Sequence, residues 1–404
     1  MRILILTEFF APSWAFGGPP KTLFEIAREL VRRRHSVTVF ATNVLDSRSE
    51  IEREYDVLEG IKVFYLKTLS KRLAWNEKIF LPIGLRKLLK ENIGDFDLVV
   101  LTCFRTIFNW IGYNFARRFG RPYVILPYGT LPRGTGLKRI LKWIIDPIFG
   151  YRMLSDASGV FAQTEHEIQE SKKYGAKDGL VKLVPLNIDL SEFENLPPRG
   201  NLRRRIGVKD QEKVILFLGR LHKYKGLNLL IKSFSHLSDI RSDCRLVIVG
   251  RDDGFLPSVL KLIKSLNLEE NVAFVGALYG KDRLEAYVDA DVFVMPSSHF
   301  EETSTATLEA CATSTPVIVT RQASIPCLNE YQAGFTIDYD QKDLENALLT
   351  ILSDEELREK MGANARRMVE EIFCLSKVVD RFEESFNSAR RPPQVATYER
   401  EKNG

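Results

Sequence analysis

Short, unbroken runs of apolar residues recur along the chain and alternate with segments of helical periodicity. Unbroken runs predict strands buried on both faces of a parallel sheet, because half-exposed strands alternate apolar with polar residues. Apolar stripes at helical spacing lie within Leu23–Val31 and Leu227–Phe234, each after a predicted strand. The predicted strands are Ile3–Leu6, Val37–Ala41, Ile61–Leu66, Leu98–Leu101, Tyr123–Leu126, Val160–Ala162, Leu183–Leu186, Val214–Leu218, Leu246–Val249, Val272–Val275, Val292–Met295 and Val317–Val319.

Strand-then-helix order predicts an α/β fold with two doubly wound, Rossmann-like parallel-sheet domains. The carboxyl ends of both sheets would then face an inter-domain cleft. The apolar periodicity lapses where Asn195-Leu-Pro-Pro-Arg-Gly precedes Arg203–Arg205, which indicates a boundary. The expected segments are an N-terminal domain over residues 1–192, a linker over 193–210, a C-terminal domain over 211–375, a C-terminal helix over 376–390 that returns to the N-terminal domain, and a polar tail over 391–404.

Length and composition agree with two globular domains. The 404 residues exceed the size of about 250–300 residues at which a single core stops growing. No signal peptide and no run of ~20 apolar residues is recognisable. The five cysteines are odd in number and lack metal-ligand spacing. These features predict a cytoplasmic protein without a zinc site.

The net charge of +5 is unevenly distributed along the chain. Residues 1–192 carry 29 Lys and Arg against 21 Asp and Glu, so the basic excess lies in the first half. Within it, Lys67–Lys90 and Leu137–Ile148 interleave basic with apolar and aromatic residues. Such segments suit either an anionic membrane surface, with the protein peripheral on the inner face of the cytoplasmic membrane, or helices packed on the first domain. Nucleic acid is not predicted, because no recognition motif accompanies them.

Two glutamates, Glu301 and Glu309, flank a polar stretch directly after the apolar run Val292–Met295. If a helix begins near Ser304, then Thr305 and Glu309 lie one turn apart, and free backbone N–H groups face the preceding loop. An anion would be favoured at that position. A carboxylate at each end suits a ligand with sugar hydroxyls on both sides of a phosphate, which is the chemistry of a nucleotide-sugar.

A basic loop follows the predicted strand Val214–Leu218 and contains Arg220 and Lys225 between glycines. The arginine offers a planar fork and the lysine a point charge, and together they can hold both phosphates of a diphosphate. A solvated basic loop before a helix is the alternative interpretation.

Two loops of the first half could line the same cleft. Gly17 and Gly18 follow the first strand and enter a helix, where backbone N–H groups could approach a phosphate or sugar. This pair is not G-x-G-x-x-G, so a nicotinamide dehydrogenase is not supported. Tyr128 ends another strand and could bond a hydroxyl of an acceptor or sugar, although a packing tyrosine is the alternative.

Three Asp-x-Asp triplets raise the question of a metal. They are Asp95/Asp97, Asp289/Asp291 and Asp338/Asp340. The first two lead into predicted buried strands, where a polar residue commonly ends an apolar run. We therefore predict no essential metal and no other cofactor.

Taken together, these motifs resemble the retaining glycosyltransferases of family 4, the group 1 glycosyltransferases with the two-domain GT-B fold. The resemblance spans nearly the whole chain. The segments that carry it are the Gly17-Gly18 loop, Gly219-Arg220 through Lys225-Gly226-Leu-Asn-Leu-Leu, Val272-Ala-Phe-Val-Gly276, Ala290-Asp-Val-Phe-Val-Met-Pro-Ser, Glu301 to Glu309, and Thr315-Pro316-Val-Ile-Val.

The resemblance implies roles for six positions. Arg220 and Lys225 would hold the diphosphate of a UDP- or GDP-linked donor, Glu301 would contact the transferred hexose, and Glu309 would bond the ribose. Backbone N–H groups near Ser304 and Thr305 would meet the phosphate. Family members generally transfer the sugar on the front face with retention of configuration. A saccharide or lipid-linked saccharide acceptor, as in cell-surface polysaccharide or glycolipid synthesis, is then expected.

One segment departs from the family pattern. Many members carry glycine, an aromatic residue and glycine after the first glutamate, whereas this chain has Glu302, Thr303 and Ser304. A histidine often found near Tyr128 is absent as well. Three alternatives therefore stay open: a nucleotide-sugar-binding protein without turnover, a sugar-nucleotide epimerase of GT-B architecture, and a polyanion-binding module that uses the basic first half.

Overall fold

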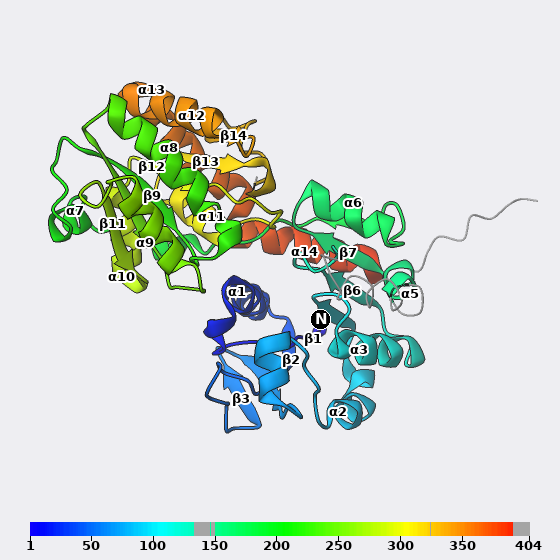
Figure 1. Cartoon of the computed structure of the whole chain (residues 1–404). Coiled ribbons are helices and arrows are strands. Elements are labelled where there is room, and N and C mark those ends of the chain that lie inside the picture. Colours follow the sequence, from blue (N-terminus) through cyan, green and yellow to red (C-terminus); the bar gives the residue numbers. More distant parts are fainter. Residues whose placement is uncertain (133–145, 147–149, 324, 391–404) are drawn as a thin grey trace, which may run out of the picture. The chain divides into compact units, whose positions relative to one another are not determined.

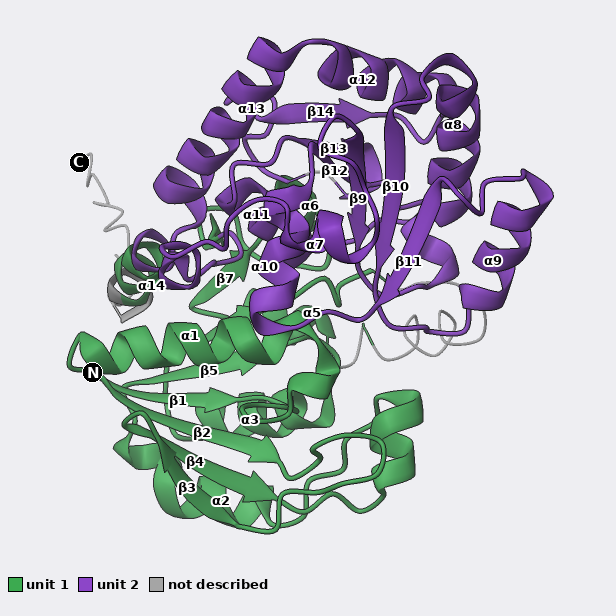
Figure 2. Cartoon of the chain, turned by 90° about the vertical axis from the view of Figure 1, so that its left-hand side faces the viewer, with its two compact units in different colours: residues 1–184, 379–404 green, residues 185–378 purple. Residues whose placement is uncertain are grey.

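The computed structural model describes residues 1–132, 146, 150–323 and 325–390. The chain forms two compact units (Figures 1 and 2). Unit 1 contains Met1–Val184 and Val379–Gly404, and unit 2 contains Pro185–Val378. Unit 1 is thus discontinuous in sequence, and each unit is described below by itself.

Unit 1 is built on an eight-stranded sheet with the order β3-β4-β2-β1-β5-β6-β7-β8. All neighbouring strands are parallel except β3, which pairs antiparallel with β4 at one edge. Register is fixed by unbroken apolar pairs such as Ile3 with Val37 and Ile5 with Val100. The strands are β1 (Arg2–Leu6), β2 (Ser36–Thr42), β3 (Tyr55–Leu58), β4 (Ile61–Leu66), β5 (Leu98–Thr102), β6 (Tyr123–Leu126), β7 (Gly159–Ala162) and β8 (Val181–Leu183).

Helices cover the unit 1 sheet, as a doubly wound fold requires. Helix α1 buries an apolar stripe that includes Leu23, Ile26 and Leu30. Helix α3 approaches the sheet closely, because a Cβ atom at Gly112 would meet Leu6 Cδ1 at 2.5 Å. The helices of this unit are α1 (Gly18–Arg32), α2 (Leu85–Asn92), α3 (Ile107–Arg118), α5 (Tyr151–Ser155) and α6 (Glu165–Lys173), together with most of α14 (Leu375–Arg390).

Helix α14 completes unit 1 from the far end of the sequence. Phe382 and Phe386 pack on Phe161 of β7, with ring centroids 5.3 and 5.7 Å away. On its polar side, Asp380 and Glu383 pair with Arg33 after α1, at 2.6 and 2.7 Å.

Unit 2 is built on a six-stranded parallel sheet with the order β11-β10-β9-β12-β13-β14. Its strands are almost entirely apolar and, together with the facing helices, form one large hydrophobic core. The strands are β9 (Lys213–Leu218), β10 (Cys244–Val249), β11 (Val272–Gly276), β12 (Val292–Met295), β13 (Val317–Thr320) and β14 (Gly334–Ile337). The helices are α7 (Asn201–Arg205), α8 (Leu227–Ile240), α9 (Leu256–Ser265), α10 (Gly280–Asp289), α11 (Thr305–Ala312), α12 (Gln341–Ser353) and α13 (Glu355–Met368).

The predicted fold class, two parallel-sheet α/β domains, is confirmed. The bounds of the two units differ from the expected division of the chain. Unit 1 ends at Val184, and residues 193–210, expected as a linker, lie within unit 2. Arg203 is 3% exposed there and pairs with Asp291 at 2.6 Å. The basic run that suggested a solvated linker therefore carries a buried cation paired with a carboxylate.

Candidate donor and acceptor sites

The candidate donor site of unit 2 is assembled by loops at the carboxyl ends of β9 and β12. The turn Lys223–Lys225 follows β9 and ends at Gly226, which has a φ of 72°. A Cβ atom at Gly226 would lie 1.7 Å from the carbonyl oxygen of Pro296, directly after β12. Only glycine permits this approach, so Gly226 brings the two loops together.

The approach of these loops places Lys225 beside Glu301. The Lys225 Nζ atom lies 2.5 Å from Glu301 Oε2, and the side chains are 17% and 25% exposed. Ser297 donates a hydrogen bond from its hydroxyl to Glu301 Oε1, also at 2.5 Å. The Glu301 backbone N–H bonds the carbonyl of Gln322 at 2.9 Å. The carboxylate is therefore held by Lys225 and Ser297, and the backbone of Glu301 is held by Gln322.

Helix α11 begins next to this carboxylate. Ser304 is its N-cap, and the Ser304 side chain accepts a bond from the N–H of Thr307. The N–H groups of Thr305 and Ala306 have no acceptor within the helix, which makes the start of α11 suitable for an anion. The Ser304 hydroxyl is engaged in capping the helix, and the residue is only 8% exposed. A ligand would therefore meet the backbone N–H groups and not the Ser304 side chain.

Glu309 lies on the second turn of α11 and is 5% exposed. The Tyr287 hydroxyl donates to Glu309 Oε2 at 2.9 Å, and Arg283 Nη1 lies 3.1 Å from Oε1. Burial and the adjacent Glu309 carboxylate raise the pKa of Tyr287, so this hydroxyl keeps its proton. Arg283 also pairs with Glu192 at 2.9 Å. These contacts fix the position of the carboxylate.

Arg220 is arranged differently from Lys225. It follows β9, is 58% exposed along its side chain, and pairs with Asp253 of the β10–α9 segment at 2.7 Å. Lys225 and Ser297 therefore both contact Glu301 directly. Arg220 instead forms its ion pair with a different loop.

The candidate residues of unit 1 lie at the carboxyl ends of β1 and β6. Gly17 is the N-cap of α1 with a φ of 98°, and Gly18 is its first residue. Pro19 and Pro20 follow and carry no N–H, so this helix start offers fewer donors than α11. Tyr128 adopts a φ of 50°, a strained value for a bulky residue, and its hydroxyl is buried without a partner among the described residues.

The Asp-x-Asp triplets serve structural roles. Asp289 accepts bonds from the backbone N–H groups of Gly200 and Arg203, and Asp291 pairs with Arg203. Of the others, Asp97 pairs with Arg2, Asp338 pairs with Arg321, and Asp340 caps α12. Among the residues that the structure describes, no cluster of three His, Cys, Asp or Glu side chains is arranged to hold a metal ion.

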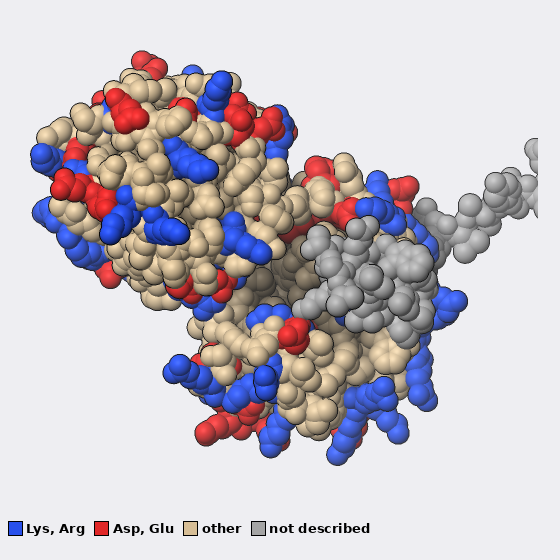
Figure 3. Space-filling view, in the orientation of Figure 1, with Lys and Arg blue, Asp and Glu red and all other residues tan. Residues whose placement is uncertain are grey.

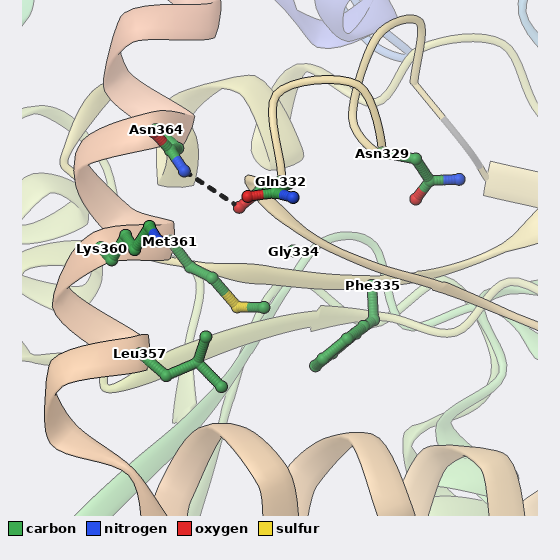
Figure 4. A pocket seen from close by; sticks show the side chains of 8 residues that line it. All are labelled: Asn329, Gln332, Gly334, Phe335, Leu357, Lys360, Met361 and Asn364. Atoms are coloured by element: carbon green, nitrogen blue, oxygen red, sulfur yellow. Dashed lines mark hydrogen bonds between the residues drawn. The ribbon is translucent and has the colours of Figure 1, made fainter.

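A separate pocket of about 420 Å³ lies at the amino end of β14, the opposite end from the loops described above (Figure 4). Apolar side chains of α13 and β14 point into it, and amide groups surround them. Its lining residues are Asn329, Gln332, Gly334, Phe335, Leu357, Lys360, Met361 and Asn364.

No helix in the described ranges is both long and apolar enough to cross a membrane. The segment Leu137–Ile148, expected as a basic amphipathic piece, lies outside the described residues except for Asp146.

The fold of the two units is that of the GT-B class. Structures with the same fold include sucrose-phosphate synthase from Thermosynechococcus elongatus (TM-score 0.75, 18% identity, 96% of this chain and 98% of that chain). Anabaena HepE in complex with UDP is similar as well (TM-score 0.76, 19% identity, 96% and 100%). At these identities the likeness establishes the fold.

Two family models match the sequence and together cover most of it. "Glycosyltransferase Family 4" matches residues 16–192, and "Glycosyl transferases group 1" matches residues 198–368. The chain belongs to the group 1 glycosyltransferases of family 4, and it is a transferase enzyme.

Two curated relatives illustrate the range of the family. An uncharacterized glycosyltransferase of Methanocaldococcus jannaschii is 26% identical over 94% of this chain and 96% of its own length. The D-inositol 3-phosphate glycosyltransferase of Kineococcus radiotolerans is 30% identical, but the match covers 54% of each chain. The chain thus spans about half the length of this second relative.

The sequence did not single out the residues that orient the two glutamates. Ser297 follows β12 immediately, and Arg283 and Tyr287 lie four residues apart on α10, where their spacing places them on one helix face. That spacing indicates that the two side chains can contact the same partner. The partner, Glu309, is 22 residues beyond Tyr287 and could not be identified from spacing.

Proposed function

We propose that this enzyme transfers a hexosyl group from a UDP- or GDP-linked sugar to a saccharide or lipid-linked saccharide acceptor, with retention of configuration. The observation that carries the proposal is the contact between Lys225 and Glu301 at the start of α11. A cation, a carboxylate and free helix N–H groups at one place suit a diphosphate joined to a sugar.

In the unliganded chain, Lys225 and Glu301 neutralise one another. A bound diphosphate supplies a second anion for Lys225, and Glu301 can then accept hydrogen bonds from hexose hydroxyls. Arg220 has an exposed side chain and exchanges Asp253 for a phosphate oxygen. Glu309, held by Tyr287 and Arg283, accepts the ribose hydroxyls.

The reaction that follows needs no protein nucleophile. The bond between the anomeric carbon and the diphosphate oxygen breaks, and the acceptor oxygen bonds to the same face of that carbon. The acceptor proton passes to the departing phosphate oxygen. Lys225 and the N–H groups of Thr305 and Ala306 stabilise the negative charge on the leaving group.

A thermal-shift screen with UDP-glucose, UDP-N-acetylglucosamine and GDP-mannose tests the donor site. A sugar nucleotide that binds the native state raises the melting temperature by mass action. We expect Lys225→Ala to abolish the shift, because the diphosphate loses its nearest cation. Lys223→Ala is the matched control, since Lys223 lies in the same turn with its side chain against the Tyr224 ring, and it should retain the shift. An unchanged shift in Lys225→Ala removes this residue from the site.

Product analysis distinguishes the alternatives. Transfer to an added saccharide with the donor's anomeric configuration, read by NMR, supports the proposal. Release of free UDP without any acceptor favours a sugar-nucleotide epimerase. Binding without transfer or UDP release favours a binding protein, for which the altered residues Glu302, Thr303 and Ser304 are the motivation.

We also propose that unit 1 contacts an anionic membrane surface, where a lipid-linked acceptor would lie, from the cytoplasmic side. Its segment 69–87 exposes apolar side chains: Leu69 is 70% exposed and Ile83 is 54% exposed. Lys71, Arg72 and Lys87 lie in the same segment. Apolar side chains among cations are the combination that binds the boundary of an anionic bilayer.

A further inference from the structure

Glu8 is a buried carboxylic acid just beyond the end of β1 in unit 1. It is 2% exposed, and neither of its carboxyl oxygens has a hydrogen-bond partner at normal geometry among the described residues, although the Thr106 hydroxyl and the Cys103 thiol lie near enough to lower its pKa. A buried polar group without a partner is costly, and native proteins rarely retain one. The orphaned carboxyl group therefore needs a reason, and a bound ligand would supply one.

Two other buried polar groups lie at the same sheet edge. Asn43 follows β2 and Tyr128 follows β6, and within the part of the chain that the structure describes neither the Asn43 Oδ1 atom nor the Tyr128 hydroxyl has a hydrogen-bond partner. Strands β2, β1, β5 and β6 are consecutive and parallel, so their carboxyl ends meet at one edge. A carboxyl group, an amide oxygen and a hydroxyl at one edge match a ligand rich in hydroxyl groups.

The backbone around these groups is held in strained conformations. Cys103 and Arg105, after β5, have φ values of 65° and 64°, and Tyr128 has a φ of 50°. The side chain of Asn109 bonds the carbonyls of Thr102 and Cys103. The Arg105 guanidinium bonds Asp146 and the carbonyls of Thr130 and Leu131. Strain of this kind gathers at ligand sites whose geometry is fixed in advance.

The Glu8 carboxyl group titrates near neutrality. Burial raises its pKa to about 7, against smaller opposing effects of the Thr106 hydroxyl, the Glu8 backbone and the Cys103 thiol. The neighbouring thiol is itself protonated, because burial raises the pKa of Cys103. Above this pKa the Glu8 carboxylate is ionised and accepts hydrogen bonds only.

We propose that Glu8 binds a hydroxyl group of the saccharide acceptor, and that Asn43 and Tyr128 complete this acceptor subsite in unit 1. The inference rests on the proposed glycosyl transfer and adds the residues that recognise the second substrate. Glu8 acts as a binding residue, because the acceptor proton leaves with the donor phosphate.

The variant Glu8→Gln tests the subsite, because it keeps the side-chain shape and removes the ionisable group. Saturation-transfer NMR would measure binding of glucose, mannose, N-acetylglucosamine and glucuronate as probes. We expect at least one probe to bind the unaltered protein more tightly as pH rises through about 7. In Glu8→Gln that probe should bind about tenfold more weakly and without the pH dependence, as expected for a lost bond to a charged group.

Stability gives a second readout, which reports the ionisation of Glu8 itself. Because the folded-state pKa is raised, ionisation of Glu8 destabilises the native state as pH rises from about 5 to 7. Glu8→Gln should therefore melt higher than the unaltered protein near pH 8. Glu29→Gln is the control. Glu29 lies on α1 in the same unit and pairs with Arg33, so its replacement should leave probe binding unchanged.

The outcomes separate this inference from the proposed function. Unchanged probe binding in Glu8→Gln, or failure of every probe to bind the unaltered protein, would each overturn the acceptor subsite. A lower melting temperature of that variant near pH 8 would contradict the raised pKa of Glu8 and, with it, the expected pH dependence of binding. If Glu8→Gln does not fold, Tyr128→Phe removes a single hydroxyl and must weaken the same probe. Failure of every sugar nucleotide in the thermal-shift screen would count against the donor proposal instead.

Discussion

At the scale of single residues, the two glutamates of the candidate donor site are each oriented by side chains from other elements. Glu301 is held by Ser297 and Lys225, and Glu309 by Tyr287 and Arg283. Orientation matters because a misplaced group loses much of its effect on a reacting sugar. Ser297 is therefore a positioning residue for Glu301 in the proposed reaction.

Ser297→Ala should lower kcat about tenfold while the KM for the donor and its thermal shift change little. The hydroxyl that holds Glu301 Oε1 is lost, whereas Lys225 still meets the diphosphate. Initial rates across donor concentrations provide the measurement. Ser298→Ala is the control, because Ser298 bonds the Tyr224 carbonyl and His299 instead. An unaltered kcat in Ser297→Ala would show that Glu301 needs no such support.

At the scale of elements, the sequence predicted strands buried on both faces and missed two short edge strands. Strand β3 alternates exposed with half-buried residues, and β14 is half-buried at its middle, so neither forms an unbroken apolar run. Lys225 and Glu301 were predicted for one site from their motifs. Their direct contact depends on the packing of Gly226 against Pro296, which no local pattern reports.

The acidic side of α14 should attach that helix to unit 1 in a pH-dependent way. Burial raises the pKa of Glu383, but the hydrogen bonds from His35 and Arg33 lower it by more than burial raises it. The pKa of Glu383 is therefore below its usual value. The stabilisation is therefore present above the unfolded-state pKa of about 4.5 and is lost as pH falls through the lower folded-state value. The protection factors for hydrogen exchange in α14, which are corrected for the intrinsic effect of pH, should fall below about pH 4.5.

Arg33→Ala should reproduce this loosening near neutral pH. Arg33 pairs with Asp380 and Glu383, which are partly exposed, so a loss of only about 1 kcal/mol is expected. Arg32→Ala is the control, because Arg32 is 64% exposed and lies 3.9 Å from its partner Glu29. Equal exchange rates in α14 of both variants would contradict the attachment.

At the scale of the whole molecule, charge is divided between the two halves of the sequence. Residues 1–192 hold a basic excess, and Figure 3 shows Lys and Arg side chains spread over the visible face of unit 1. The exposed apolar residues Leu69, Leu73, Ile79 and Ile83 belong to the same unit. These cations and exposed apolar residues, in the half of the chain matched by the family 4 model, are the basis of the proposed membrane contact.

Binding to phosphatidylglycerol vesicles should follow from this surface. We expect sedimentation with anionic vesicles, little with phosphatidylcholine, and a decrease as salt shortens the Debye length from about 10 Å at 0.1 M. Some binding to anionic vesicles should persist at high salt, and replacing Leu69 and Ile83 by serine should weaken this remaining binding. Equal binding to phosphatidylcholine vesicles would contradict the electrostatic part of the proposal.

The return of the chain to unit 1 has a consequence for its synthesis on the ribosome. Unit 2 is one continuous segment, so all the residues that form its core are made before Phe382 and Phe386. Phe382 and Phe386, which cover Phe161, emerge about two hundred residues after it. Part of the interior of unit 1 therefore stays uncovered while unit 2 is made and folds.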